Sequence, residues 1–304
     1  MRFPAAFIAF AATGLIGSLA ACGNDPSGGG PIEVVATTTQ VGSIAAELGG
    51  DAIELTVLLE PGIEAHDFEI TPAAGAAIEE AALILKSGAG LETWLDDAID
   101  TIGDADRVQD LSEGVELRSP AGGDEDVDPH YWMSAPNAIA MVENARDALV
   151  EAAPAAAGEI AERADGLVAR LEAADAEIRA LIDEIPSDRR DVVTDHDALG
   201  YFIDEYGLEF LGSVFPSLDV SADPSARDIE ELVSLIREND VPAIFSESAV
   251  NPQLAEAVAD ETGATLSDET LYTDSLGASG SGADTLDGML LHNARVLHDG
   301  LLGG

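Results

Sequence analysis

The sequence predicts an α/β protein of two lobes, each a parallel sheet flanked by helices, joined by one long helix that spans both. Short apolar, β-branched segments alternate with helical segments along the chain, which is typical of parallel sheets. The 304 residues suffice for two domains of roughly 150 residues each. One central stretch, 155–185, lacks proline and repeats its apolar residues at close to a helical period.

Residues 32–153 are predicted to form the N-terminal lobe. Thr71 and Pro72 indicate one helix start, because proline is well tolerated in the first turn of a helix. The predicted strands are 32–38, 53–59, 82–85 and 107–111, and the predicted helices are 41–48, the segment from Thr71, 91–102 and 136–152.

The linking helix is predicted within residues 154–186, where the stretch 155–185 would span roughly 45 Å at about 1.5 Å per residue. A coiled-coil segment is the alternative for this stretch. Residues 187–304 are predicted to form the C-terminal lobe. Its predicted strands are 191–194, 208–214, 243–246 and 264–266, and its helices are 198–206, 226–238, 252–262 and 285–298, the last after a glycine-serine loop at 275–283.

Charge and cysteine content exclude several classes of protein. Lys and Arg number 13 against 59 Asp and Glu, so the formal net charge is −46. Such a surface repels phosphate backbones, so no nucleic-acid partner is expected. The single cysteine excludes a disulfide framework and a cysteine-based zinc finger. The sequence has neither GxGxxG after a strand nor GxxxxGK[ST], so a nucleotide site is not expected.

The N-terminal segment has the pattern of a bacterial lipoprotein signal. Residues 1–21 combine Arg2 with an uncharged apolar run, which is typical of a cleaved signal peptide. The residues Leu19-Ala20-Ala21-Cys22-Gly23 resemble a lipobox, and 22–31 is predicted to be a flexible tether. An uncleaved transmembrane helix is the alternative. The mature protein is therefore expected outside the cytoplasmic membrane, anchored by lipid on Cys22.

Three histidines lie where a parallel α/β sheet collects ligands. His66 and His196 follow predicted strands, and His130 precedes the predicted helix 136–152. Ligands of such sheets bind beyond the carboxyl ends of the strands. Asp274 is a fourth candidate, and three imidazoles with one carboxylate suit a four-coordinate zinc ion, whereas manganese prefers more oxygen. The alternative for each residue is an ordinary surface side chain.

Five motifs, in order, resemble the zinc- and manganese-binding lipoproteins of bacterial ABC importers, the ZnuA/TroA-like substrate-binding proteins. They are PGIEAHDFE at 61–69, DPHYW at 128–132, HDALGYF at 196–202, FSES at 245–248 and LYTDSLG at 271–277. The resemblance implies a metal-ion receptor without catalytic activity, with an ABC permease and its ATPase as partners. It implies that a metal ion binds in the cleft between the lobes, with two ligands from each lobe. The implied ligands are His66, His130, His196 and Asp274.

The resemblance also implies a role for Glu247, as an acceptor that orients a ligating histidine or as an occasional extra ligand. His196 favours zinc, because manganese-binding members often have glutamate there, while manganese and iron(II) stay as alternatives. Met133, Ser134 and Ala135 replace the leucine, aspartate and proline that usually follow DPHxW. Any support that this aspartate gives to the site in other members is therefore absent here. The acidic stretch 119–128 lacks histidine, so an auxiliary zinc site is not expected.

Other classes of function stay open at this point. A membrane-tethered zinc hydrolase would need an open coordination position and a general base. A receptor for an organic solute or an iron chelate would need an aromatic or arginine-rich cleft. Cell adhesion is compatible with transport. A monomer is expected, and His292 and His298, six residues apart, are expected to be ordinary residues of the last helix.

Overall fold

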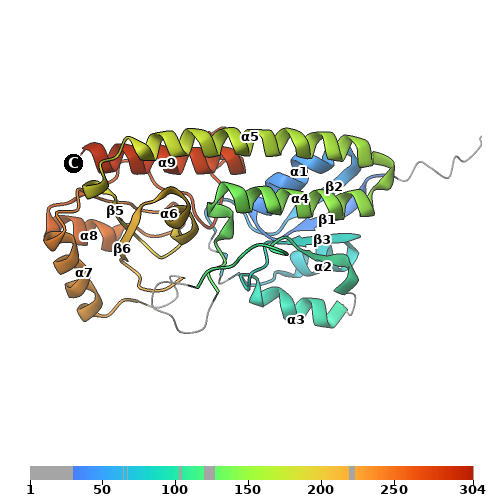
Figure 1. Ribbon diagram of the computed structural model, residues 1–304. Coiled ribbons are helices and arrows are strands. Elements are labelled where there is room, and N and C mark those ends of the chain that lie inside the picture. Colours follow the sequence, from blue (N-terminus) through green and yellow to red (C-terminus); the bar gives the residue numbers. More distant parts are fainter. Residues whose placement is uncertain are drawn as a thin grey trace, which may run out of the picture.

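The computed structural model describes residues 30–63, 65–66, 68–102, 105–119, 127–218 and 223–303. The predicted signal peptide 1–21, Cys22 and all but two residues of the predicted tether 22–31 lie outside these ranges. Among the described residues, no helix combines the length and the apolar character that crossing a bilayer requires. Two α/β lobes lie side by side along one long helix (Figure 1).

A four-stranded parallel sheet forms the centre of the N-terminal lobe, in the order β2-β1-β3-β4. Its first strand is buried from Val34 to Ala36, as expected for a parallel strand with both faces covered. The four strands fall within or beside their predicted ranges, at β1 (Ile32–Ala36), β2 (Ile53–Val57), β3 (Leu83–Lys86) and β4 (Val108–Asp110).

Local capping chemistry starts two helices of this lobe. The side chain of Thr38 accepts a hydrogen bond from the amide of Val41, and that of Thr71 accepts one from the amide of Ala74. Each satisfies an amide that has no partner within its helix. The helices are α1 (Thr39–Gly49), α2 (Pro72–Glu80), α3 (Thr93–Ile102) and α4 (Ala135–Ala152), the last preceded by the 3-10 turn η3 (Tyr131–Met133).

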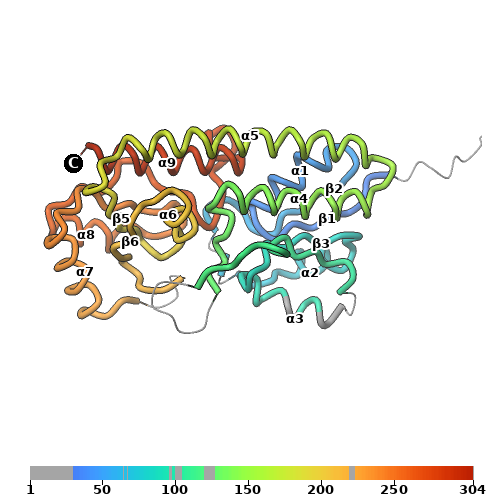
Figure 2. Tube along the Cα trace, in the orientation of Figure 1, coloured from blue at the N-terminus to red at the C-terminus, as the bar shows by residue number. Residues whose placement is uncertain are grey.

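The long helix predicted from the central stretch is α5 (Ala157–Asp183), whose 27 residues span about 40 Å at about 1.5 Å each. It begins over the N-terminal lobe and ends over the C-terminal lobe, with α9 (Leu286–Gly303) alongside (Figure 2). One apolar stripe of α5 is buried in a core that includes residues of both lobes, so this layer holds them together. The stripe consists of Ile160, Ala164, Leu167, Leu171, Ile178 and Ile182.

The C-terminal lobe has two short parallel ladders, β5–β6 and β7–β8, joined where the amide of Phe245 donates to the carbonyl of Val193 at 2.9 Å. The strands are β5 (Asp191–Thr194), β6 (Glu209–Ser213), β7 (Ala243–Ile244) and β8 (Thr265–Leu266). The helices are α6 (Gly200–Tyr206), α7 (Ala226–Glu238) and α8 (Gln253–Thr262).

The strands β7 and β8 are shorter than the predicted segments 243–246 and 264–266. The chain leaves the regular ladder after Ile244 and continues through single bridges, first from Phe245 to Thr194 and then from Glu247 to Leu271. This departure places Glu247 beyond the strand end.

Candidate metal centre

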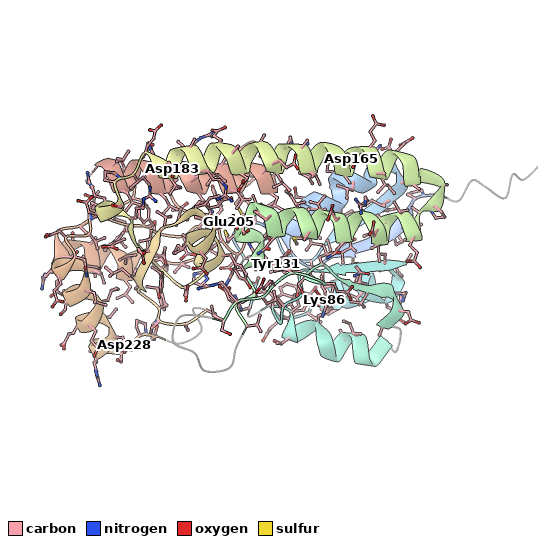
Figure 3. All side chains as sticks on the ribbon, in the orientation of Figure 1. Lys86, Tyr131, Asp165, Asp183, Glu205 and Asp228 are labelled. Carbon is pink, nitrogen blue, oxygen red and sulfur yellow. The ribbon has the colours of Figure 1, made fainter. Side chains whose placement is uncertain are left out.

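The four predicted ligands, distant in sequence, lie together where the lobes meet. Nε2 of His66 lies 3.3 Å from Nε2 of His130, which lies 3.2 Å from Oδ1 of Asp274. Nε2 of His196 lies 3.4 Å from Oδ2 of Asp274. Asp274 is thus central, with one oxygen towards the two histidines of the N-terminal lobe and the other towards His196. Figure 3 labels Tyr131, the residue that follows His130 in the chain, and so shows where the cluster lies.

This cluster is almost completely withdrawn from solvent. The side chains of His130, His196 and Asp274 are at most 1% exposed, and that of His66 is 14% exposed. Both ring nitrogens of His196 are buried without a hydrogen bond. An unsatisfied buried polar group costs about 1–3 kcal/mol, so Nε2 of His196 is suited to accept a ligand that satisfies it.

A carboxylate stands behind each of two imidazoles. Nδ1 of His130 lies 2.8 Å from Oδ1 of Asp128, and Nδ1 of His196 lies 2.9 Å from Oε2 of Glu247. The second contact is close but poorly aligned for a hydrogen bond. A carboxylate that accepts the Nδ1 proton leaves the Nε2 lone pair free to bind a metal ion.

Glu247 is held by both of its carboxylate oxygens. Oε1 accepts a hydrogen bond from the amide of His196 at 2.9 Å, and Oε2 accepts one from the hydroxyl of Thr273 at 2.6 Å. These bonds fix the carboxylate between the residues beside two predicted ligands. The arrangement suits an orienting role, although Glu247 also lies within ligand reach of His196 and Asp274.

The charges of the cluster perturb the pKa values of its members strongly. Burial alone would lower the pKa of His130, but Asp128 and Asp274 raise it to about 10. Burial likewise opposes protonation of His196, whereas the charges of Glu247 and Asp274 raise its pKa to about 9. Burial would raise the pKa of Asp274, but the three surrounding imidazoles hold it well below its usual range.

Asp195 adds a further acidic group behind the cluster. Its Oδ2 accepts a hydrogen bond from the amide of Glu247 at 2.8 Å, while its Oδ1 is buried without a partner. Burial and the charge of Glu247 raise the pKa of Asp195 to about 7.

Indole and amide donors fix the backbone beside two of the ligands. Nε1 of Trp94 donates to the carbonyl of Ala65, the residue before His66, at 3.0 Å. The carbonyl of Thr273, the residue before Asp274, accepts from both Trp132 and Gln40 at 3.0 Å. These roles are not predictable from the sequence, because no sequence pattern pairs such distant residues.

The remaining histidines lie elsewhere, in agreement with their prediction as residues of the last helix. Nε2 of His292 lies 2.9 Å from the carbonyl oxygen of Thr270, and Nδ1 of His298 lies 2.8 Å from Oδ1 of Asp299.

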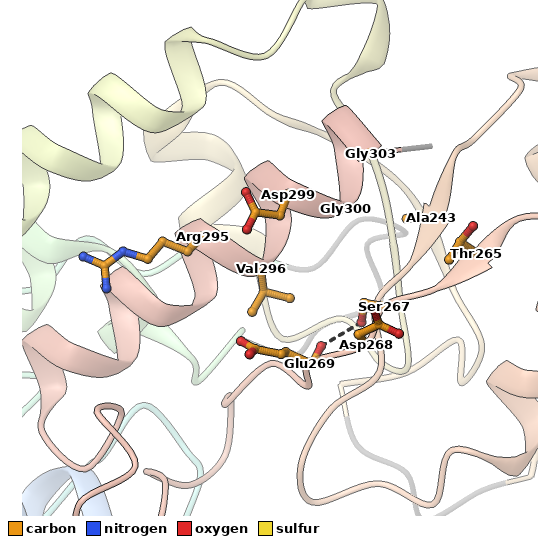
Figure 4. A pocket seen from close by; sticks show the side chains of 10 residues that line it. All are labelled: Ala243, Thr265, Ser267, Asp268, Glu269, Arg295, Val296, Asp299, Gly300 and Gly303. Atoms are coloured by element: carbon orange, nitrogen blue, oxygen red, sulfur yellow. Dashed lines mark hydrogen bonds between the residues drawn. The ribbon is translucent and has the colours of Figure 1, made fainter.

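A separate cavity of about 380 Å³ lies between α9 and the β7–β8 ladder (Figure 4). Its walls include Asp268, Glu269, Arg295 and Asp299. The hydroxyl of Ser267, which also lines the cavity, donates a hydrogen bond to the carbonyl of Glu269 at 2.8 Å. None of the four predicted ligands lines it.

Most of the chain matches a known protein family. Residues 34–300 match the family model of ZnuA, the periplasmic zinc-uptake complex component A. The manganese-binding lipoprotein MntA of Bacillus subtilis is 32% identical over 96% of this chain and 95% of its own length. The iron-binding protein YfeA of Yersinia pestis is 32% identical over 91% of this chain and 88% of its own.

A solved structure agrees with the sequence relatives. The periplasmic zinc-binding protein TroA of Treponema pallidum superposes with a TM-score of 0.84 at 27% identity, covering 90% of this chain and 99% of its own.

Proposed function

Because this chain belongs to the family of periplasmic zinc-uptake complex component A proteins, we propose that it captures zinc outside the cytoplasmic membrane for an ABC importer. The metal ion is its cargo. The permease and its ATPase receive that cargo at the membrane. The proposed role is that of a solute-binding receptor and includes no catalysis.

One observation carries the proposal. Asp274 is shared by two largely buried groups of possible ligand atoms, one with His66 and His130 and one with His196 and Glu247. Within the four predicted ligands, the contacts to Asp274 and between His66 and His130 are 3.2 to 4.0 Å. A metal ion bound to Nε2 of His196 would give a partner to a nitrogen that is buried without a hydrogen bond. Three neutral imidazoles and one carboxylate make a closed four-coordinate set, which zinc favours.

The choice of zinc rests on the donor atoms. The relatives are named as manganese-, iron- or zinc-binding proteins, so family membership alone does not identify the metal. Manganese prefers more oxygen donors than this set offers. Glu247 could supply one more oxygen, but both of its oxygens are already held by His196 and Thr273. Manganese and iron(II) are therefore the second candidates.

Capture and release follow from the layout. The ion exchanges its waters for ligands from both lobes, with deprotonated imidazoles as donors. Since α5 packs into a core shared by both lobes, a large hinge motion would have to disrupt that core. Release would therefore proceed through rearrangement of the ligand-bearing loops once the permease has docked.

The location of the receptor also belongs to the proposal. Lipid on Cys22 would anchor the mature chain to the outer side of the cytoplasmic membrane, with residues 22–31 as the tether. The receptor would act as a monomer, because each chain supplies all four ligands.

The test is metal analysis of the untagged protein beside His196→Ala, with His292→Ala as the matched control. The wild type and the control are expected to retain one zinc per chain, and His196→Ala is expected to lose it. Retention of manganese or iron in the presence of equimolar zinc would favour the second candidates. No metal bound to the wild type would refute the proposal.

A further inference from the structure

Arg118 joins the two lobes beside the metal centre. It follows β4 of the N-terminal lobe, and its Nη1 donates to Oδ2 of the buried Asp128 at 2.8 Å. Its Nε donates to Oδ2 of Asp204 at 3.0 Å, and Asp204 belongs to α6 of the C-terminal lobe. One guanidinium therefore bridges a carboxylate of each side.

The guanidinium is seated against the backbone of α6. A Cβ on Gly200 would lie 1.4 Å from Nη1 of Arg118, so a larger residue there would displace the guanidinium from this position. The hydroxyl of Tyr201 accepts from the amide of Arg118 at 3.0 Å and donates to the carbonyl of Asp128 at 2.8 Å. These contacts account for the adjacent Gly200 and Tyr201 of the HDALGYF motif.

Asp128 connects the guanidinium of Arg118 to His130, a predicted ligand. While Oδ2 is held by Arg118, Oδ1 accepts from the amide of His130 at 3.0 Å and lies 2.8 Å from its Nδ1. The two oxygens thus serve different partners, and the direction of the carboxylate determines the direction of the imidazole. Asp197 is also buried, and its carboxyl interacts electrostatically with both Arg118 and Asp128.

We propose that Arg118 is a positioning residue of the metal centre, which makes the orientation of His130 depend on the docking of α6 and so slows metal release. The inference rests on the proposed function, because it needs His130 as a ligand. The contact with Asp128 aims the imidazole. The contact with Asp204 makes the orientation of His130 depend on the C-terminal lobe, which carries His196.

The test uses full-length protein loaded with zinc or Co²⁺. Three quantities are measured: zinc dissociation into excess chelator, the visible spectrum of bound Co²⁺, and the melting temperature of the metal-free protein. The variants are Arg118→Ala, Arg118→Lys, Asp204→Asn and the double variant Arg118→Lys/Asp204→Asn. Arg146→Ala removes a half-buried arginine that pairs with Asp147 and serves as the control.

Arg118→Ala is expected to release zinc about tenfold or more faster and to change the Co²⁺ spectrum, because partners behind a ligand contribute about 10–100-fold in affinity. Arg118→Lys keeps a charge near Asp128 but loses the two-armed geometry. It is therefore expected to match Asp204→Asn, at an intermediate rate, with no further loss in the double variant.

Release rates within twofold of wild type for Arg118→Ala and Asp204→Asn would overturn the inference. So would a faster release that tracks a fall in melting temperature with an unchanged Co²⁺ spectrum. If Arg118→Ala does not fold, Arg118→Lys and Asp204→Asn decide the question. A wild type that binds no metal would refute the proposed function itself, a result separate from unchanged release in the variants.

Discussion

Nδ1 of His130 lies 2.8 Å from Oδ1 of Asp128, and this contact determines which nitrogen of the imidazole faces the metal centre. Because the carboxylate accepts the Nδ1 proton, Nε2 is left as the donor atom. His196 and Glu247 form the corresponding pair in the other lobe. Each lobe therefore presents one imidazole that is backed by a carboxylate.

Metal affinity is expected to rise with pH. The facing carboxylates raise the pKa of His130 to about 10 and that of His196 to about 9, so both imidazoles hold protons at neutral pH when no metal is bound. Metal must displace these protons, and each displaced proton changes affinity about tenfold per pH unit. Zinc binding is expected to weaken about 10,000-fold between about pH 8 and about pH 6, because two protons are displaced over an interval of two pH units.

Chelator competition at each pH checks this prediction, and calorimetry in buffers of different ionisation enthalpy counts the released protons. An affinity that stays constant over this range, with no proton release, would contradict the assignment of the imidazoles as ligands.

Glu247→Gln is expected to lower zinc affinity about tenfold without unfolding the protein, because outer partners of a ligating histidine contribute about 10–100-fold. The amide keeps the size of the side chain but removes the negative charge that faces Nδ1 of His196. Equilibrium titration against a zinc indicator measures the change, with Glu269→Gln at the separate cavity as the control. Equal affinity in both variants would show that Glu247 has no role in orienting His196.

The sequence predicted the two lobes and the long helix well, because β-branched segments, helix starts and apolar periodicity are local signals. It misjudged the lengths of β7 and β8, because the ladder there ends where the chain turns through Phe245 to Glu247. That turn depends on pairing with Thr194 and Leu271, which are remote in the chain.

The candidate ligands could be named from the sequence because each stands in a recognisable motif, and their role as ligands stays a prediction. Asp128 was visible within DPHYW but was not assigned a role. The donors Trp94 and Gln40 and the bridge by Arg118 depend on contacts between remote segments that leave no periodic trace in the sequence.

His196→Glu is expected to shift metal preference towards manganese, because it replaces a nitrogen donor by oxygen. The ratio of bound manganese to zinc after equilibration with both ions is expected to rise about tenfold or more. Elemental analysis measures that ratio, and His292→Glu controls for added surface charge. An unchanged ratio would mean that His196 does not set the preference.

Leu171→Ala is expected to destabilise the fold by about 2–5 kcal/mol, because it opens a cavity beneath α5, where Leu171 is fully buried. Urea unfolding of the metal-free protein measures the loss, and the exposed neighbour gives the control Glu172→Ala. Metal stoichiometry is expected to stay at one per folded chain. A loss below about 1 kcal/mol would mean that this core does not hold the lobes together.

Anomalous diffraction at the zinc edge from crystals of the zinc-loaded protein tests the central claim most directly. One strong peak is expected at about 2.0–2.1 Å from Nε2 of His66, His130 and His196, and within bonding distance of an oxygen of Asp274. A strongest peak outside the reach of these four side chains, for example among Asp268, Glu269 and Asp299, would contradict the account.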